Sequence, residues 1–323
     1  LTAQMQPYHI KNIAEGLIPE ADVVIRQFDY KVQVTKQDAT KTHFKKAITI
    51  LNKNGLDHAD LVVLYNKGDQ VKIISAKVFN KNGELLNKIK NKDIEDFSAT
   101  GQETMISDDR VLHYSPPYSE FPFTVEYEYE VSNKNTFFSV IFPSFPANVS
   151  IENAKLEITS PPDYEFLIKE FNMEAPDSIL TQKEKILTWT ISNISASGFE
   201  PYAPDKRYYT PHVYVCPRVF SIAGIEGSTD TWKDFGMWVW KLNQGRDQLP
   251  LNTVLHLLDI TKDLNSTKEK VKAVYQYMQS KTHYVGIQLG LGGLQPTDAT
   301  TVDNVGYGDC KGLTNYMRAM LNA

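Results

Sequence analysis

The stretch from Phe123 to Val131 constrains the fold most strongly, because its side chains alternate between two classes at every step. The apolar or aromatic residues are Phe123, Val125, Tyr127, Tyr129 and Val131. The polar residues between them are Thr124, Glu126, Glu128 and Glu130. A period of two is typical of a β-strand with one buried face. The stretch therefore predicts a strand of an antiparallel sheet, with the glutamates on a face that meets water.

Similar strand signals recur over the first two thirds of the chain. Short apolar or alternating runs, separated by Pro, Asn and Ser, occupy residues 28–35, 44–50, 61–65, 71–79, 137–142, 154–158, 164–168 and 186–191. No helical signals are interleaved with these runs, which favours an all-β arrangement over a parallel α/β sheet. We therefore expect residues 1–218 to form an antiparallel β-sandwich, or two sandwiches in a row.

The apolar spacing then changes to that of helices with one buried face. Apolar residues recur at intervals of three and four in the windows 229–242 and 251–258. Ser266 and Glu269 have the spacing of a capping box, so a third helix is expected to follow them. The sequence thus predicts a multi-domain chain, with an all-β domain over 1–218 and a mainly helical domain over 219–323.

Three tryptophans fall in the first helical window. Trp232, Trp238 and Trp240 stand at helical spacing with Phe235. This spacing favours packing in the core or between domains over stacking on a ligand. We therefore expect these side chains to be covered.

The charge and composition of the chain limit its partners. Its 34 basic and 39 acidic side chains give a net charge of −5 and form no basic stripe, which argues against nucleic acid as a partner. No apolar run approaches the roughly 18 residues of a membrane-spanning helix, so no transmembrane segment is expected. The histidines are scattered without metal-ligand spacing, so neither a metal nor a cofactor is predicted. Nothing in the sequence indicates the oligomeric state.

The first residues, LTAQMQPYHI, form neither a full signal peptide nor an initiator methionine followed by a folded domain. They are typical of a mature N-terminus left after cleavage, so we expect an exported protein in the periplasm or at the cell envelope. The two cysteines make no disulfide framework and do not fix the compartment.

A second informative stretch, residues 302–322, contains Cys310. Gly306 and Gly308 precede it in a predicted turn, and Asp309 is expected to cap the helix that follows. The apolar positions of that helix are Leu313, Met317, Met320 and Leu321, and Cys310 is expected to share their buried face. A helix N-terminus offers unpaired N–H groups and the positive end of the macrodipole, which favour a thiolate and therefore a nucleophilic cysteine.

Three blocks around this stretch resemble the start of a transglutaminase-like core of the papain-like cysteine superfamily. They are HYVGIQLG at 283–290, QP at 295–296 and GYGDCKGL at 306–313. The β-rich region before them resembles the DUF3857 domain, which commonly precedes such cores in exported bacterial proteins. Together the two resemblances cover nearly the whole chain, and they imply a β-sandwich followed by a partial α+β transglutaminase-like core.

The resemblance implies acyl transfer, in which a cysteine thiolate attacks an amide carbonyl. Cys310 matches the nucleophile, and its backbone N–H is a candidate oxyanion donor. Gln288, and after it Gln295, is a candidate for a side-chain amide at the oxyanion hole, although a polar loop residue is the simpler interpretation. The family's His and Asp follow the cysteine helix. Residues 311–323 contain no His, Asp or Glu, so we expect both beyond residue 323 and expect this chain alone to be inactive.

Simpler interpretations stay open at several positions. Cys310 has the alternative of a buried structural cysteine. Lys311 is either a solvated first-turn residue or a weak electrostatic aid to the thiolate. His283 has the alternative of acting as the base in an inverted His–Cys dyad. For the whole protein, a hydrolase that acts on peptide or isopeptide bonds of a peptide or protein substrate is preferred to a cross-linking enzyme, by family analogy. The alternative from another class is a non-catalytic binding or scaffolding protein at the cell envelope, whose β-sandwich recognises a partner and whose transglutaminase-like core is vestigial.

Overall fold

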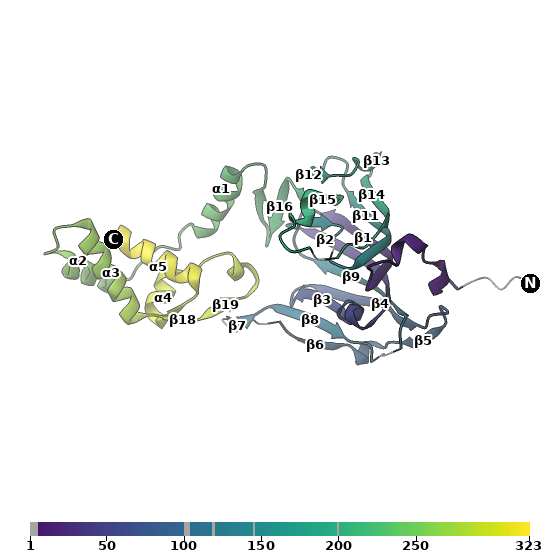
Figure 1. The fold of residues 1–323 in the computed structure, drawn as a ribbon. Coiled ribbons are helices and arrows are strands. Elements are labelled where there is room, and N and C mark those ends of the chain that lie inside the picture. The colour runs from purple at the N-terminus through teal and green to yellow at the C-terminus, as the bar shows by residue number, and fades with distance from the viewer. Residues whose placement is uncertain (1–5, 100–103, 118–119, 145, 199) are drawn as a thin grey trace, which may run out of the picture. The chain divides into compact units, whose positions relative to one another are not determined.

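The computed structural model describes residues 6–99, 104–117, 120–144, 146–198 and 200–323 (Figure 1). The chain divides into two compact units, a β-rich unit of Leu1–Phe97 and Val111–Asp230 and a helical unit of Ser98–Arg110 and Thr231–Ala323. The β-rich N-terminal region that the sequence predicts is confirmed. The units differ from the predicted domains in two places, because 219–230 fall in the β-rich unit and 98–110 in the helical unit.

An eight-stranded sheet is the largest element of the β-rich unit, with the order β13-β14-β11-β1-β2-β9-β4-β5. The strands are β1 Val23–Lys36, β2 Ala39–Ile50, β4 Gln70–Phe79, β5 Leu85–Lys88, β9 Phe123–Asn133, β11 Val149–Ser160, β13 Asp177–Leu180 and β14 Lys185–Ile194. Neighbours are antiparallel except β1 and β11, which run parallel. The antiparallel prediction is therefore wrong at this pair. Hairpin signals reveal antiparallel neighbours only, so a long-range parallel pair leaves no trace in the sequence.

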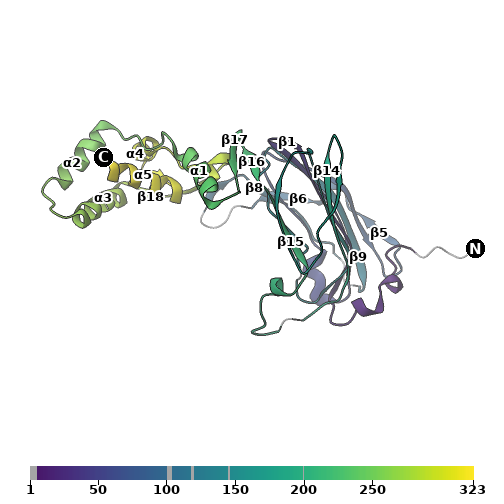
Figure 2. The same ribbon diagram turned by 90° about the horizontal axis from the view of Figure 1, so that it is seen from above.

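Two three-stranded sheets, β10-β15-β12 and β3-β8-β6, pack against the large one. Their strands are β10 Val140–Phe142, β15 His212–Pro217, β12 Phe166–Phe171, β3 Leu61–Asn66, β8 Asp109–Tyr114 and β6 Glu95–Ser98, and the hairpin β16 Val219–Ile222 and β17 Ile225–Ser228 follows. One buried cluster joins Phe123 and Leu156 of the large sheet to Val213 and Leu61 of the small ones. The unit is thus a β-sandwich, and Figure 2 shows β15 beside the wall of β1, β9 and β14.

The glutamate face of β9 is only partly open to water. Thr124 and Glu126 are 1% and 6% exposed. The Tyr8 hydroxyl donates to Glu126 Oε2 at 2.6 Å, and Lys77 Nζ lies 2.8 Å from Oε1. Burial alone would raise the pKa of Glu126, but hydrogen bonds from Lys77 and Tyr8 outweigh it and lower the pKa. The prediction of a solvated face is wrong at this end of β9, because Tyr8, just before η1 (Ile10–Asn12), lies against Glu126.

Five α-helices and two short ladders form most of the described part of the helical unit. They are α1 Trp232–Asn243, α2 Leu251–Thr261, α3 Thr267–Lys281, α4 Ala299–Val305 and α5 Cys310–Asn322, with β18 His283–Tyr284 beside β20 Tyr307–Gly308, and β19 Gly286–Gln288 beside β7 Thr104–Ser107. The three helices expected between 229 and the cysteine stretch are confirmed, as is the capping box of Ser266 and Glu269. No helix among the described residues has the length and apolar character needed to cross a membrane.

Helix α1 buries one of its three tryptophans. Trp238 is 2% exposed, whereas Trp232 and Trp240 are 90% and 51% exposed. Trp238 and the buried Leu242 are four positions apart and share one helix face, whereas Trp240 is two positions from Trp238 and lies on another side. The prediction of packing in the core of the helical unit is therefore wrong for Trp232 and Trp240, and packing between domains stays a prediction for them.

Candidate active site

Two glycines shape the turn that leads into α5. Gly306 ends α4 in the left-handed region, with a φ of 71°, where any residue with a Cβ is strained. A Cβ at Gly306 would also lie 3.1 Å from the carbonyl oxygen of Lys281. A Cβ at Gly308 would lie 3.2 Å from Cδ2 of Leu313. The predicted glycine turn is confirmed, and each glycine has a steric reason.

The parallel ladder of β18 and β20 fixes this turn. The N–H of His283 donates to the carbonyl oxygen of Gly306 at 2.8 Å. The rings of His283 and Tyr307 lie 5.6 Å apart, measured between centroids. The ladder therefore holds His283 beside the turn. Among the described residues, however, no histidine hydrogen-bonds to the Cys310 thiol.

Asp309 is the N-cap of α5, as predicted. Its Oδ1 accepts from the backbone N–H of Gly312 at 2.7 Å, and the residue is 6% exposed. A Cβ at Gly312 would lie 3.3 Å from that oxygen, so a glycine suits the cap. Lys311 pairs with Asp309 Oδ2 and is partly buried. The interpretation of Lys311 as a freely solvated residue is therefore wrong, because its charge is held by the cap.

Cys310 is the first residue of α5, and its side chain is exposed. The buried positions of α5 are Gly312, Asn315, Tyr316, Ala319 and Met320. The prediction that Cys310 shares the buried face is wrong. Most of the buried positions lie one residue before the positions that the spacing of the Leu and Met residues predicted. Exposure is what a reactive cysteine needs, and it disfavours the buried structural alternative. Cys216 is partly buried, and both cysteines are free.

The first turn of α5 presents unpaired N–H groups next to the thiol. The N–H of Gly312 donates to the Asp309 side chain, and that of Leu313 donates to the Asp309 carbonyl oxygen at 2.9 Å. The N–H groups of Cys310 and Lys311 have no acceptor within the described ranges. Such orphan donors attract negative charge at a helix N-terminus.

A buried carboxylate ties four helices together. Asp303 Oδ1 of α4 accepts from Lys281 Nζ of α3 at 2.6 Å, from the Tyr316 hydroxyl of α5 at 2.6 Å and from the Thr253 hydroxyl of α2 at 2.8 Å. Burial alone would raise the pKa of Asp303, but hydrogen bonds from these three groups outweigh it and lower the pKa. Burial, and then the bond to Asp303, raises the pKa of Tyr316. Sequence reasoning missed this group, because no local motif links the four positions.

Gln295 and Asn315 brace the loop before α4. Gln295 Nε2 donates to the carbonyl oxygen of Leu242 at 3.0 Å, and Asn315 Nδ2 donates to that of Arg246 at 2.7 Å. The Arg246 guanidinium donates to the Pro296 carbonyl oxygen at 3.2 Å. The Gln295 amide is therefore engaged in holding the loop to α1, which agrees with the simpler interpretation.

Gln288 ends β19 and is exposed. Its backbone carbonyl accepts from the N–H of Asp108 at 3.1 Å, and β19 pairs with β7. The strand that leads to Cys310, β20, pairs instead with β18. Within the described residues no hydrogen bond joins the Gln288 side chain to Cys310. Its place at an oxyanion hole therefore stays a prediction.

Comparison with known families locates the β-rich part of the chain. Residues 36–197, half of the sequence, match the family described as "Domain of Unknown Function with solved-structure structure (DUF3857)". The chain belongs to the DUF3857 family. The match begins at the end of β1 and ends after β14, so Cys310 and the helices lie outside the matched DUF3857 region. No curated protein sequence matches the chain.

Two of the solved structures that match the DUF3857 chain differ widely in their similarity to it. A crystal structure of a "putative protease" from Parabacteroides distasonis ATCC 8503 superposes with a TM-score of 0.67 at 14% identity. The similarity covers 93% of this chain and 58% of that protein, so the chain spans somewhat more than half of its neighbour. Legionella pneumophila aminopeptidase A in complex with aspartic acid gives a TM-score of 0.31 at 16% identity, over 74% of this chain and 28% of that one. The similarity to the Parabacteroides distasonis structure shows a fold shared across both units.

A metal site in a protein brings several His, Cys, Asp or Glu side chains together in one place. No group of three or more His, Cys, Asp or Glu residues is arranged for this in the part of the chain that the structure describes.

Proposed function

We propose that the protein is a cysteine acyl-transfer enzyme, a peptidase or amidase that attacks peptide or isopeptide bonds through Cys310. The observation that supports this most directly is the exposed thiol at the start of α5, beside two N–H groups for which the described residues offer no acceptor. Further support comes from the resemblance of 283–313 to a transglutaminase-like core, and from the fold shared with a protein named as a "putative protease".

In the proposed reaction the thiolate of Cys310 attacks the carbonyl carbon of the scissile amide. A carbon–sulfur bond forms, and the negative charge that develops on the carbonyl oxygen is stabilised by the N–H groups of Cys310 and Lys311. The carbon–nitrogen bond then breaks, and the leaving amine takes a proton from a general acid. Water hydrolyses the acyl-enzyme, which releases the acid and restores the thiol.

Helix α5 is held in place at two points, which suits a helix that carries a nucleophile. The Asp303 group fixes the helix from its buried side, and Asp309 fixes its first turn. A nucleophile that is positioned before substrate arrives loses less freedom in the transition state. We further propose that the general base, a histidine with its orienting aspartate, is supplied by sequence after residue 323. The proposed setting is the periplasm or cell envelope.

Alkylation of the native protein by iodoacetamide, read at each cysteine by mass spectrometry, tests the nucleophile. Cys310 is expected to react at least about tenfold faster than Cys216, and faster than free N-acetylcysteine at neutral pH, because the thiolate is the reacting form. Cys216→Ala is the matched control and should leave the rate at Cys310 unchanged. A Cys310 that reacts no faster than N-acetylcysteine contradicts the proposal.

Peptidase assays then locate the base. The 323-residue chain is expected to be inactive on a mixed peptide library, and a form extended by the following sequence is expected to be active and to lose activity in Cys310→Ala. Activity of the 323-residue chain that is lost in both Cys310→Ala and His283→Ala would assign the base to His283 instead.

One observation favours the scaffold alternative. No histidine among the described residues contacts the thiol, so the helical unit lacks a complete catalytic pair within them. On this alternative the extended form would also be inactive, and Cys310 would be alkylated at the rate of an ordinary thiol.

A further inference from the structure

A lysine stands on the core-facing side of the large sheet. Lys46 of β2 is paired across the strands with Phe28 of β1 and with Tyr127 of β9. Tyr127 is 4% exposed, and Phe28 packs against the main buried cluster. Residues opposite one another on neighbouring strands point to the same face of a sheet. The amine of Lys46 therefore enters a layer of aromatic and aliphatic side chains.

Lys46 has no acidic partner in this layer. Other lysines of the sheet do, since Lys41 lies 2.8 Å from Glu130 and Lys77 lies 2.8 Å from Glu126. Within the described ranges no carboxylate lies at ion-pair distance from Lys46, and its ammonium lies 5.5 Å from the centroid of the Phe28 ring. Lys46 is partly buried, and that burial lowers the pKa of its amine. An unpaired cation in such a place is unfavourable unless an anion joins it.

A cavity of about 310 Å³ opens beside Lys46. Its apolar wall includes Phe28, Phe44 and Tyr129, and the Phe44 and Tyr129 rings stack with centroids 5.0 Å apart. Tyr30 continues the stack at 4.2 Å from Phe44, and burial raises the pKa of Tyr30 to about 12. The Phe28, Phe44 and Tyr129 rings that line the cavity are partly buried, and they offer flat aromatic surface to a ligand.

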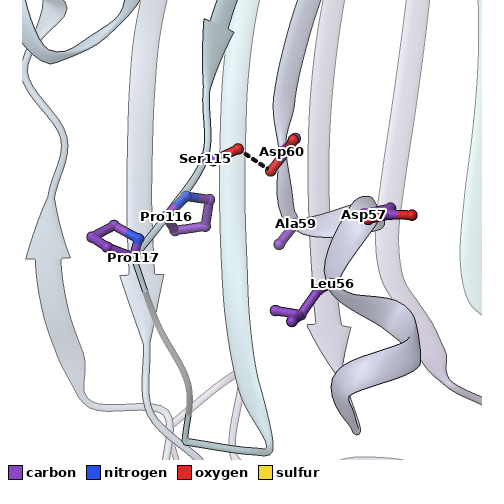
Figure 3. A pocket seen from close by; sticks show the side chains of 7 residues that line it. All are labelled: Leu56, Asp57, Ala59, Asp60, Ser115, Pro116 and Pro117. Carbon is purple, nitrogen blue, oxygen red and sulfur yellow. Dashed lines mark hydrogen bonds between the residues drawn. The ribbon is translucent and has the colours of Figure 1, made fainter.

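The acids near the cavity are already engaged or lie at its exposed rim. Asp60 accepts from the Ser115 hydroxyl at 2.6 Å, and its other oxygen lies 3.2 Å from His113 Nε2. Figure 3 shows the Ser115 bond in an adjoining hollow of about 450 Å³, which Asp57 and Asp60 also line. Asp57 is exposed. The other ionisable lining group besides the tyrosines is His58, whose pKa is lowered by burial and by the charge of Lys46.

We propose that this cavity binds a small carboxylate that carries an aromatic group. The carboxylate pairs with Lys46, and the ring lies against Phe28, Phe44 and Tyr129. The site belongs to the DUF3857 region and is independent of Cys310 and of the proposed acyl transfer. A free aromatic acid and the C-terminal phenylalanine of a peptide share this chemistry, and the experiment separates them.

The test is calorimetric titration of the whole chain with phenylpropionate, phenylpropionamide and the peptide Gly-Gly-Phe with a free or an amidated C-terminus. Phenylpropionate is expected to bind at least about tenfold more tightly than its amide, because only the acid pairs with the ammonium. Tight binding of the free-acid peptide as well would identify a peptide C-terminus as the ligand class, and its failure to bind would identify a free acid. No binding of either acid, or equal binding of acid and amide, overturns the proposal.

Variants of β2 assign the contact. Lys46→Met is expected to weaken phenylpropionate binding by about tenfold or more, whereas Lys46→Arg keeps it within about threefold. Lys45→Met is the matched control, since the next residue of the strand points to the opposite face, and it should leave binding unchanged. Lys46→Met is expected to melt at or above the temperature of the unsubstituted protein, because it removes an unpaired cation from an apolar layer. Unchanged binding in a folded Lys46→Met protein contradicts the assignment.

Discussion

Asp303 receives three hydrogen bonds on one oxygen, and each donor comes from a different helix. In the sequence it is one acidic residue among 39, and nothing marks Thr253, Lys281 and Tyr316 as its partners. A buried charge of this kind is stable only while its partners are present. The stability of the helical unit should therefore depend on this residue more than on any surface ion pair.

Asp303→Asn is expected to lower the free energy of unfolding of the helical unit by about 2–4 kcal/mol, as measured by urea unfolding. Because the folded pKa of Asp303 is lowered, its contribution is complete above the unfolded carboxyl value of about 3.9 and is lost as pH falls through the folded pKa. The difference in the free energy of unfolding between Asp303→Asn and the unsubstituted protein should therefore disappear at acid pH.

The exposed pair of Asp259 and Lys262, 2.8 Å apart on α2, offers the control for this prediction. Asp259→Asn should cause no measurable loss of stability, since surface ion pairs contribute little. Two outcomes would show that Asp303 is not held as a charged group. One is an equal loss of stability in Asp303→Asn and Asp259→Asn. The other is a loss in Asp303→Asn that stays the same at acid pH.

Gly306→Ala is expected to lower the free energy of unfolding by about 1–2 kcal/mol, because the residue adopts a φ of 71° that alanine disfavours. Gly292→Ala is the control, since a Cβ there meets no atom within 4 Å and its φ is not positive. Urea unfolding of the two variants measures the difference. Equal stability of the two would argue against strain at Gly306.

Single residues of the site were predictable where a local pattern carried them. The glycine turn and the Asp309 cap follow from residue types at fixed spacing, and both are confirmed. The exposure of Cys310 was not predictable in this way, because Tyr316 and Ala319 form the buried face beside stronger apolar residues. Which neighbours a helix packs against decides such a face, and one sequence does not contain that information.

Among the elements, those with strong periodicity were predicted correctly. Strand β9 and helix α3 begin within one residue of the expected positions, because alternation and a capping box mark them. Strand β7 was missed, since its residues pair only with the distant β19. The contacts of Tyr8 were also not predicted, because it bonds to Glu126 and packs on Phe79, residues far from it in the sequence.

Tyr8→Phe is expected to lower the free energy of unfolding of the β-rich unit by about 1–2 kcal/mol, since a buried carboxylate loses a donor. Chemical denaturation followed by the fluorescence of the buried Trp189 measures it. Tyr202→Phe, at a fully exposed tyrosine, is the control and should be neutral. If both variants are neutral, the segment does not depend on this bond.

At the scale of the whole molecule, the buried side chains form separate cores. Among the described residues, the main cluster of the sheets draws on the β-rich unit alone, and the cluster around Val302 and Tyr316 draws on the helical unit alone. Cooperative unfolding follows shared cores, so units with separate cores tend to unfold separately. The sequence predicted two regions of different class, which is the part of the organisation that periodicity reveals.

Calorimetry of the chain is expected to show two transitions. Asp303→Asn should lower the midpoint of the transition of the helical unit and leave that of the β-rich unit within about 1 °C. Tyr8→Phe should lower the midpoint of the β-rich unit and leave that of the helical unit within about 1 °C. A single transition that both variants shift would mean that the two units unfold as one.

Strand β7 has a consequence for the order in which the protein is made. The N–H of Gly290, just after β19, donates to Asp108, which lies 182 residues earlier in the chain. A ribosome therefore releases the β7 segment long before its partner strand exists, and the segment stays without that partner while the β-rich unit is being synthesised. The helical unit is completed only after synthesis of its last helices. A gene fragment that starts at residue 231 would encode those helices and leave β19 without its neighbour.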